Sequence, residues 1–257
     1  MGYKMYKCIT LKRNNSTGII TFSPPRRPSA SVNQLAEEMH DVCDVINHDN
    51  SYRVVIVTGD NTKAFSFCAE RSNPSDSVPE SADYSLTMPV AQLRSPVIAA
   101  INGDAVGQGL ELALACDLRI ATTTAHFALP QITKGLIPWD GATQRLPRLI
   151  GKSKALEMLL TGLTIDAQEA QRIGLVSYLC QPGEPLTSAM KLAEQISTRA
   201  YVALVYAKEA LCKGLDMTLE QGLGLEADLY FLLQTTKDRT EGIKAFLDRR
   251  TPRFRGE

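Results

Sequence analysis

Short apolar runs in the first part of the chain predict strands of a parallel sheet. Arg53–Thr58 is a continuous β-branched run followed by a glycine, and Pro96–Ile101 and Asp117–Thr122 give two more strands. Such runs are typical of strands buried on both faces. Asn33–Ile46 and Gly107–Cys116 instead carry apolar residues at helical spacing. This alternation of strands and helices predicts parallel pairing with right-handed crossovers.

The N-terminal segment predicts an antiparallel hairpin. Tyr6–Lys12 and Gly18–Ser23 have the pattern of strands, and Asn14–Asn15 lies between them in a turn-forming stretch with serine and glycine. Further along, the polar stretch Ser72–Ala82 predicts a long loop, and Leu86–Arg94 predicts a helix.

From about Thr164 onward the apolar spacing is almost entirely helical. The predicted helices are Asp166–Arg172, Pro185–Arg199, Tyr201–Lys213, Met217–Leu233 and Lys237–Arg249. The residues expected to cap them are Asp166 with Glu169, Gly174, Gly214, and Thr218 with Gln221. We therefore expect an α/β protein with a mixed sheet-and-helix core over residues 1–163 and a helical lobe over residues 164–257.

Composition excludes several classes of protein. The 257 residues hold 28 Lys plus Arg and 28 Asp plus Glu, so the basic excess of a nucleic-acid-binding protein is missing. The apolar runs are far shorter than the roughly 18 residues of a membrane span. Six scattered cysteines without a CxxC pair indicate reduced thiols in the cytoplasm. The three histidines are not at metal-ligand spacing, so we expect no metal.

The segment Pro96–Ala121 carries the strongest chemical signal. A buried strand runs into a glycine-rich turn that opens directly into a short apolar helix. Free backbone N–H groups at such a helix start favour negative charge and suit an oxyanion. Glu111 stands in the first helical turn among leucines and alanines, where poor solvation raises a carboxyl pKa toward the range of acid–base catalysis. The alternative is that the glycines only permit close packing and that Glu111 faces solvent.

This segment resembles the crotonase (enoyl-CoA hydratase/isomerase) superfamily, whose hallmark is P-x-I-A-A-x-N-G-x-A-x-G-x-G-x-E-L-A-x-x-C-D. The other segments that resemble the family in order and spacing are Phe22–Asn33, Lys63–Glu70, Gly135–Gly151, Leu159–Ala170 and Glu241–Arg250. The resemblance covers essentially the whole chain. It implies a crotonase-like ββα spiral core with a C-terminal helical trimerisation lobe, and an assembly that is a homotrimer or homohexamer.

The resemblance also implies a substrate, an acyl-CoA thioester, with coenzyme A as part of the substrate and no separate cofactor. The two backbone N–H groups of the family's oxyanion hole fall on Ala69 and Gln108. Arg26 and Arg27 match positions near the CoA phosphates and adenosine, with solvated surface charge as the alternative. Cys68 replaces a glycine in the Ala69 loop and is a candidate substrate contact, with a structural thiol as the alternative.

The acid–base residues are where the chain departs from the family. Glu111 matches the first of the two glutamates of classical hydratases, but the second falls on Gln131, whose amide orients water without exchanging a proton. Asp140 is a candidate replacement acid, alone or paired with Glu111, and the alternative is that it caps the helix starting near Gly141. Trp139 beside it is expected to wall the acyl pocket, or else to serve packing.

Three functions remain open. The first is enoyl-CoA hydratase or double-bond isomerase chemistry, with the change to Gln131 favouring isomerisation because that reaction needs only one proton-shuttling carboxylate. The second is a hydrolase or a ring-acting member that uses Asp140. The third is a non-catalytic binding or scaffold protein that keeps the acyl-CoA pocket.

Overall fold

The computed structural model describes residues 6–23, 30–60, 65 and 85–257 of the chain. Six strands form the main sheet in the order β1-β2-β3-β4-β6-β9. They are β1 (Ile9–Asn14), β2 (Thr17–Phe22), β3 (Val54–Gly59), β4 (Val97–Ile101), β6 (Leu118–Thr122) and β9 (Tyr178–Cys180). β1 and β2 pair antiparallel and all later neighbours pair parallel. The predicted hairpin and the three predicted parallel strands are confirmed.

A second, small sheet was not predicted. It joins β5 (Ala105–Val106), β7 (His126–Ala128) and β8 (Ile165–Asp166) in the order β5-β7-β8. These strands have only two or three residues each, so their sequences show no period-two alternation. The small sheet fixes the chain just before the short apolar helix that follows β5.

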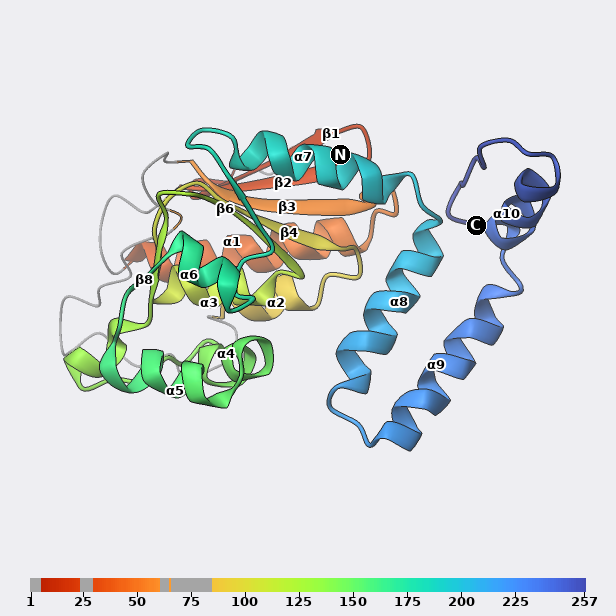
Figure 1. Cartoon of the computed structure of the whole chain (residues 1–257). Coiled ribbons are helices and arrows are strands. Elements are labelled where there is room, and N and C mark those ends of the chain that lie inside the picture. The colour runs from red at the N-terminus through yellow and green to blue at the C-terminus, as the bar shows by residue number, and fades with distance from the viewer. Residues whose placement is uncertain (1–5, 24–29, 61–64, 66–84) are drawn as a thin grey trace.

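Helices cover both faces of the main sheet. The helices before residue 198 are α1 (Ala30–Asn47), α2 (Thr87–Ala91), α3 (Gln108–Ala115), α4 (Ala142–Ile150), α5 (Lys152–Thr161), α6 (Ala167–Arg172) and α7 (Pro185–Ser197), with the 3-10 helix η2 (Pro130–Lys134). Figure 1 shows α7 on one face of the sheet and α1, α2 and α3 on the other.

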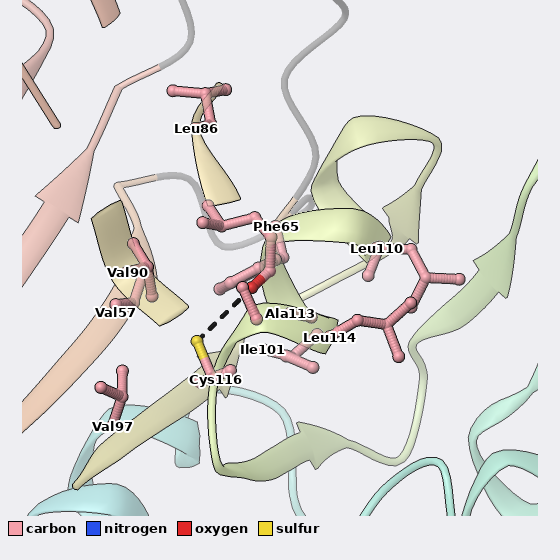
Figure 2. Packing of buried hydrophobic residues seen from close by; sticks show 14 of the residues in the cluster. Val57, Phe65, Leu86, Val90, Val97, Ile101, Leu110, Ala113, Leu114 and Cys116 are labelled. Atoms are coloured by element: carbon pink, nitrogen blue, oxygen red, sulfur yellow. Dashed lines mark hydrogen bonds between the residues drawn. The ribbon is translucent and has the colours of Figure 1, made fainter. Parts of the chain in front are cut away.

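The burial of β3 shows why its apolar run is continuous. Val54 and Ile56 join a buried cluster with residues of α7, whereas Val55 and Val57 join the larger cluster with residues of α1, α2 and α3. All four side chains are fully buried. Figure 2 shows part of the larger cluster, in which Phe65 lies among side chains of α2, α3 and β4. The strand is therefore buried on both faces, as its sequence predicted.

The three last helices extend away from the sheet (Figure 1). They are α8 (Tyr201–Gly214), α9 (Leu219–Leu233) and α10 (Lys237–Leu247). A partly buried contact joins α8 to the residues just before β4 and β6, because Lys208 Nζ lies 2.7 Å from Asp117 Oδ2 and donates to the Ser95 carbonyl at 3.1 Å. The division into residues 1–163 and 164–257 stays a prediction.

The predicted helix starts agree with the structure in one case and in part in another. Thr218 and Gln221 form the full capping box at α9. Asp166 caps α6 by accepting from the Glu169 backbone N–H. The Glu169 carboxylate, however, binds Arg172. The second capping box was therefore wrong, since the charged guanidinium is the stronger partner.

The predicted helix ends also differ. Gly174 has φ 82° two residues beyond α6, as expected of a C′ glycine. Gly214 is instead the last residue of α8, and Leu215 caps the helix, so the prediction of a C′ glycine there was wrong. Within the described residues, no helix is both long enough and apolar enough to cross a membrane.

Candidate active site

The turn before α3 sets the position of the first helical turn. Gly107 has φ 59° and ψ −124°, a conformation that favours glycine. Its N–H donates to the Ala128 carbonyl at 2.9 Å, beside the β5–β7 pairing. Gln108 is the first residue of α3, and the N–H groups of a first helical turn have no acceptor within the helix. The predicted strand–turn–helix unit is therefore present.

Glu111 is buried, with 1 % of its surface exposed. Its Oε1 atom accepts from two backbone N–H groups, Asp140 N at 2.8 Å and Ala142 N at 3.2 Å. No described residue donates a hydrogen bond to Oε2. The alternative in which Glu111 faces solvent was wrong, because the turn before α4 supplies donors that a solvent-facing carboxylate would not reach.

The buried position of Glu111 changes its acidity. Burial raises the pKa of Glu111 from 4.5 to about 7, and the negative charge of Asp140 adds to the rise. The two backbone hydrogen bonds and the Arg145 guanidinium oppose the rise. A carboxyl group with a pKa of about 7 both accepts and returns protons readily near neutral pH.

The Asp140 carboxylate is also buried, at 4 % exposure, and each of its oxygens accepts two hydrogen bonds. Oδ1 accepts from Ser85 Oγ at 2.5 Å and from Thr87 Oγ1 at 2.8 Å. Oδ2 accepts from Leu86 N at 3.0 Å and from Gln108 Nε2 at 3.4 Å. The alternative in which Asp140 caps the next helix was wrong, since α4 begins without a side-chain cap and the carboxylate binds the start of α2 instead. Its role as a replacement acid stays a prediction.

Arg145 of α4 completes this arrangement. Its Nη1 donates to Thr87 Oγ1 at 2.9 Å and to the Asp140 carbonyl at 3.0 Å. Gly141 has φ 106°, and a Cβ atom there would overlap the Arg145 guanidinium. We call Ser85, Leu86, Thr87, Asp140 and Arg145 the Asp140 clamp. Sequence reasoning found only Asp140 among them.

Gln131 lies on η2, directly after β7. Its Nε2 atom stands 3.7 Å from the position that a Cβ on Gly107 would occupy. Its Oε1 atom is buried and accepts no hydrogen bond from any residue that the structure describes. The amide therefore lies beside the turn that begins α3, with a free acceptor.

The remaining predicted site residues have different outcomes. Trp139 is half-exposed, at 47 %, beside the buried Asp140. Arg26, Arg27, Cys68 and Ala69 lie outside the described residues. The predictions for these four side chains and for the second N–H group of the oxyanion hole therefore stay predictions.

Comparisons with known proteins agree in one family. Residues 12–257 match the model of the family described as enoyl-CoA hydratase/isomerase. The chain is 40 % identical to a putative enoyl-CoA hydratase/isomerase, YngF, of Bacillus subtilis, over 95 % of this chain and 96 % of that protein. It is 38 % identical to the 2,3-dehydroadipyl-CoA hydratase of Escherichia coli, over 96 % and 98 %. A crystal structure of an enoyl-CoA hydratase from Bacillus anthracis superimposes with a TM-score of 0.89 at 38 % identity, covering 98 % of this chain and 100 % of that one.

Proposed function

Because the chain belongs to the enoyl-CoA hydratase/isomerase family, we propose that it moves the double bond of an enoyl-CoA thioester by way of a thioester enolate. The observation that carries this proposal is the state of Glu111. One of its oxygens is held by two backbone N–H groups, no described residue donates to the other, and its pKa is about 7. Coenzyme A enters as part of the substrate, and the chemistry needs no other cofactor.

The enolate requires donors at the thioester oxygen. The N–H of Gln108, at the start of α3, is one of them, and the N–H of Ala69, outside the described residues, is the other. Preorganised donors of this kind contribute about 3 kcal/mol each to the transition state, because they point at the oxygen on which charge develops. The positive end of the α3 dipole acts in the same direction.

Glu111 carries the proton. In a 3-enoyl-CoA, Oε2 removes a proton from C2 and the double bond shifts from C3–C4 to C2–C3 through the dienolate. The Glu111 carboxyl exchanges this proton with the solvent, and the same oxygen then delivers a solvent proton to C4. No atom is gained or lost, and one carboxylate suffices. Gln131 supports this reaction over two-carboxylate hydration, because an amide cannot exchange a proton with water or substrate.

Hydration of a 2-enoyl-CoA is the second candidate, and the free Oε1 atom of Gln131 favours it. A water held between Gln131 Oε1 and Glu111 Oε2 donates one hydrogen bond to each. Glu111 then takes a proton from that water as the water oxygen bonds to C3. Glu111 gives this proton to C2 in turn. Here Gln131 orients the water while Glu111 alone handles the protons.

Substrate contacts complete the proposal. Arg26 and Arg27 contact the CoA phosphates and adenosine, Cys68 lies at the loop that carries Ala69, and Trp139 walls the acyl group beside Asp140. Support for the last contact is the half-exposed indole next to the buried carboxylate. An aromatic wall there excludes water from the reacting carbons.

The test uses a panel of 3-enoyl-CoA and 2-enoyl-CoA thioesters, linear and cyclic, in D2O. Isomerisation yields the conjugated 2-enoyl product with deuterium in the acyl chain, hydration adds one D2O, and hydrolysis releases free CoA. Glu111→Gln is expected to lower the rate by at least about 10²-fold at unchanged folding. The proposal fails if the wild type binds these thioesters but neither exchanges, hydrates nor cleaves any of them. The chain would then be a binding protein.

The proposed assembly is a homotrimer or homohexamer. Its support is a set of exposed apolar side chains on the C-terminal helices, including Leu215 at 70 %, Leu219 at 80 % and Phe246 at 82 % exposure. Apolar surface of this kind marks a protein interface. Analytical ultracentrifugation at micromolar concentration is expected to give three or six times the chain mass, and a monomer would contradict the proposal.

A further inference from the structure

We propose that Asp140 is a positioning residue: the clamp around its buried carboxylate fixes the backbone N–H that holds Glu111, and the carboxylate itself carries no proton of the reaction. This inference rests on the proposed function, because it assigns a role relative to Glu111. It differs from the sequence-based expectation, in which Asp140 replaces a missing acid.

The first support is the occupancy of the carboxylate. Each oxygen accepts two donors, and two of the four donors are Leu86 N–H and Gln108 Nε2, which can only donate. The other two are the hydroxyls of Ser85 and Thr87. A proton carrier needs an oxygen directed at the substrate, whereas both oxygens of Asp140 are directed at α2 and at the Gln108 side chain.

The second support is that the backbone of Asp140 is held as well. Its carbonyl oxygen accepts from Arg145 Nη1 at 3.0 Å and shares the single Thr87 hydroxyl proton with Oδ1, the Thr87 Oγ1 atom lying 2.7 Å from the carbonyl oxygen. Its N–H donates to Glu111 Oε1 at 2.8 Å. The side chain, carbonyl and N–H of Asp140 are thus all held, with Thr87 bonding both the side chain and the carbonyl. The only one of these bonds that reaches the proton-carrying group is that of the N–H.

The third support is the position of the clamp between separate elements. Ser85 and Leu86 directly precede α2, and Thr87 is its first residue, whereas Arg145 belongs to α4 and Glu111 to α3. The Asp140 carboxylate bonds the residues at the start of α2. The Asp140 N–H, in the turn before α4, bonds Glu111 on α3. Glu111 is therefore oriented through contacts between segments that are distant in the chain, since Ser85 and Asp140 stand 55 residues apart. The two backbone bonds leave Oε2 as the oxygen free for substrate.

Thr87 separates positioning from proton transfer, because its hydroxyl bonds Asp140 and Arg145 and touches neither Glu111 nor any proposed substrate contact. Thr87→Val removes that hydroxyl at nearly constant volume and leaves both carboxyl groups in place. Thr87→Ser keeps the hydroxyl and serves as the rescue variant. Thr122→Val is the matched control, since Thr122 is an equally buried threonine whose hydroxyl, among the described residues, bonds only Thr124.

Positioning predicts a specific pattern in steady-state kinetics. Thr87→Val lowers kcat about 10- to 100-fold with KM changed less than about threefold, because misplacing a reacting group by about 1 Å costs up to about 10²-fold in rate. Thr87→Ser restores most of the rate, and Thr122→Val retains it. Asp140→Asn lowers kcat by a similar factor, and the double variant is no more than about threefold worse than the slower single variant, because both act through one clamp.

Two patterns would overturn the proposal. If Asp140 carries a proton, Asp140→Asn loses more than about 10³-fold while Thr87→Val stays near wild type, and the two losses multiply. If the clamp serves folding alone, Thr87→Val lowers the melting temperature but leaves kcat per folded protein unchanged.

A titration of the Glu111 carboxyl by ¹³C NMR tests the clamp without any turnover. An inactive wild type would therefore refute the proposed function, while this inference would still be tested by the titration. The charged groups that act on Glu111 are Asp140, in the turn, and Arg145, on α4, and Thr87→Val keeps both charges. The backbone hydrogen bonds lower the pKa of Glu111, so loosening them moves it upward. A titration identical to that of the wild type would contradict the clamp.

Discussion

The buried carboxyl of Glu111 is expected to make the active site a source of instability at neutral pH. Its pKa rises from 4.5 to about 7 in the folded protein, with burial as the largest cause. A raised carboxyl pKa means that the folded state binds the proton more tightly than the unfolded state does. The stability from this group is fully present below pH 4.5 and is lost as the pH rises through about 7.

The magnitude follows from the two pKa values. Each tenfold difference in proton affinity corresponds to about 1.4 kcal/mol, so a rise from 4.5 to about 7 corresponds to about 3 kcal/mol of unfolding free energy. Glu111→Gln removes this dependence, because the amide does not titrate. Its Oε1 atom can still accept from the Asp140 and Ala142 N–H groups that hold the glutamate.

The assay is urea unfolding of the wild type and Glu111→Gln across pH 5 to 8, monitored by circular dichroism. The variant is expected to be inactive yet more stable than the wild type by about 3 kcal/mol at pH 8, with the difference shrinking toward pH 5. Two parallel stability curves would refute the reasoning, since Glu111 would then have an ordinary pKa in the folded protein and would not be poised for proton transfer.

Four further outcomes are expected. The kcat/KM of the wild type rises with pH through about 7, because Glu111 accepts a proton only when ionised; a pH-independent rate between 5 and 8 would argue against it. Gly141→Ala lowers the unfolding free energy by about 2–3 kcal/mol in urea titrations, since a residue with a Cβ is strained at φ 106° and the Cβ would displace the Arg145 guanidinium from its hydrogen bonds. Gln131→Glu supplies a second carboxylate and raises hydration of a 2-enoyl-CoA by at least about 10-fold, measured by loss of the conjugated thioester absorbance. Lys208→Met costs about 1–3 kcal/mol in thermal unfolding, because it leaves Asp117 without the cation that joins α8 to the sheet.

Much of the fold could be predicted from the chain itself. The β-branched run of β3 predicted a strand buried on both faces, and the two clusters on either side of it confirm this. The crotonase-like α/β fold, expected from resemblance, is confirmed by the structural neighbours. The helix α5 was missed, since its apolar residues form no clear stripe, and several of its large side chains are exposed.

The candidate site could be predicted only in part, and the reason is distance along the chain. Glu111 was found because strand, turn and helix are consecutive in sequence, so local pattern placed it in the first turn of α3. The partners of Asp140 were not found, because Ser85 and Thr87 stand more than 50 positions away and carry no periodic signal. For the same reason the sequence left Asp140 as either a replacement acid or a local helix cap, whereas in the structure its carboxylate accepts from the residues at the start of α2.

Deuterium incorporation from D2O into a 3-enoyl-CoA substrate tests the central claim most directly, because it reports the proton that Glu111 is proposed to move. The wild type is expected to release the 2-enoyl product with deuterium at C4, and Glu111→Gln is expected to leave the substrate unlabelled and unconverted. Labelled product from Glu111→Gln at the wild-type rate would contradict the assignment of Glu111 as the proton carrier.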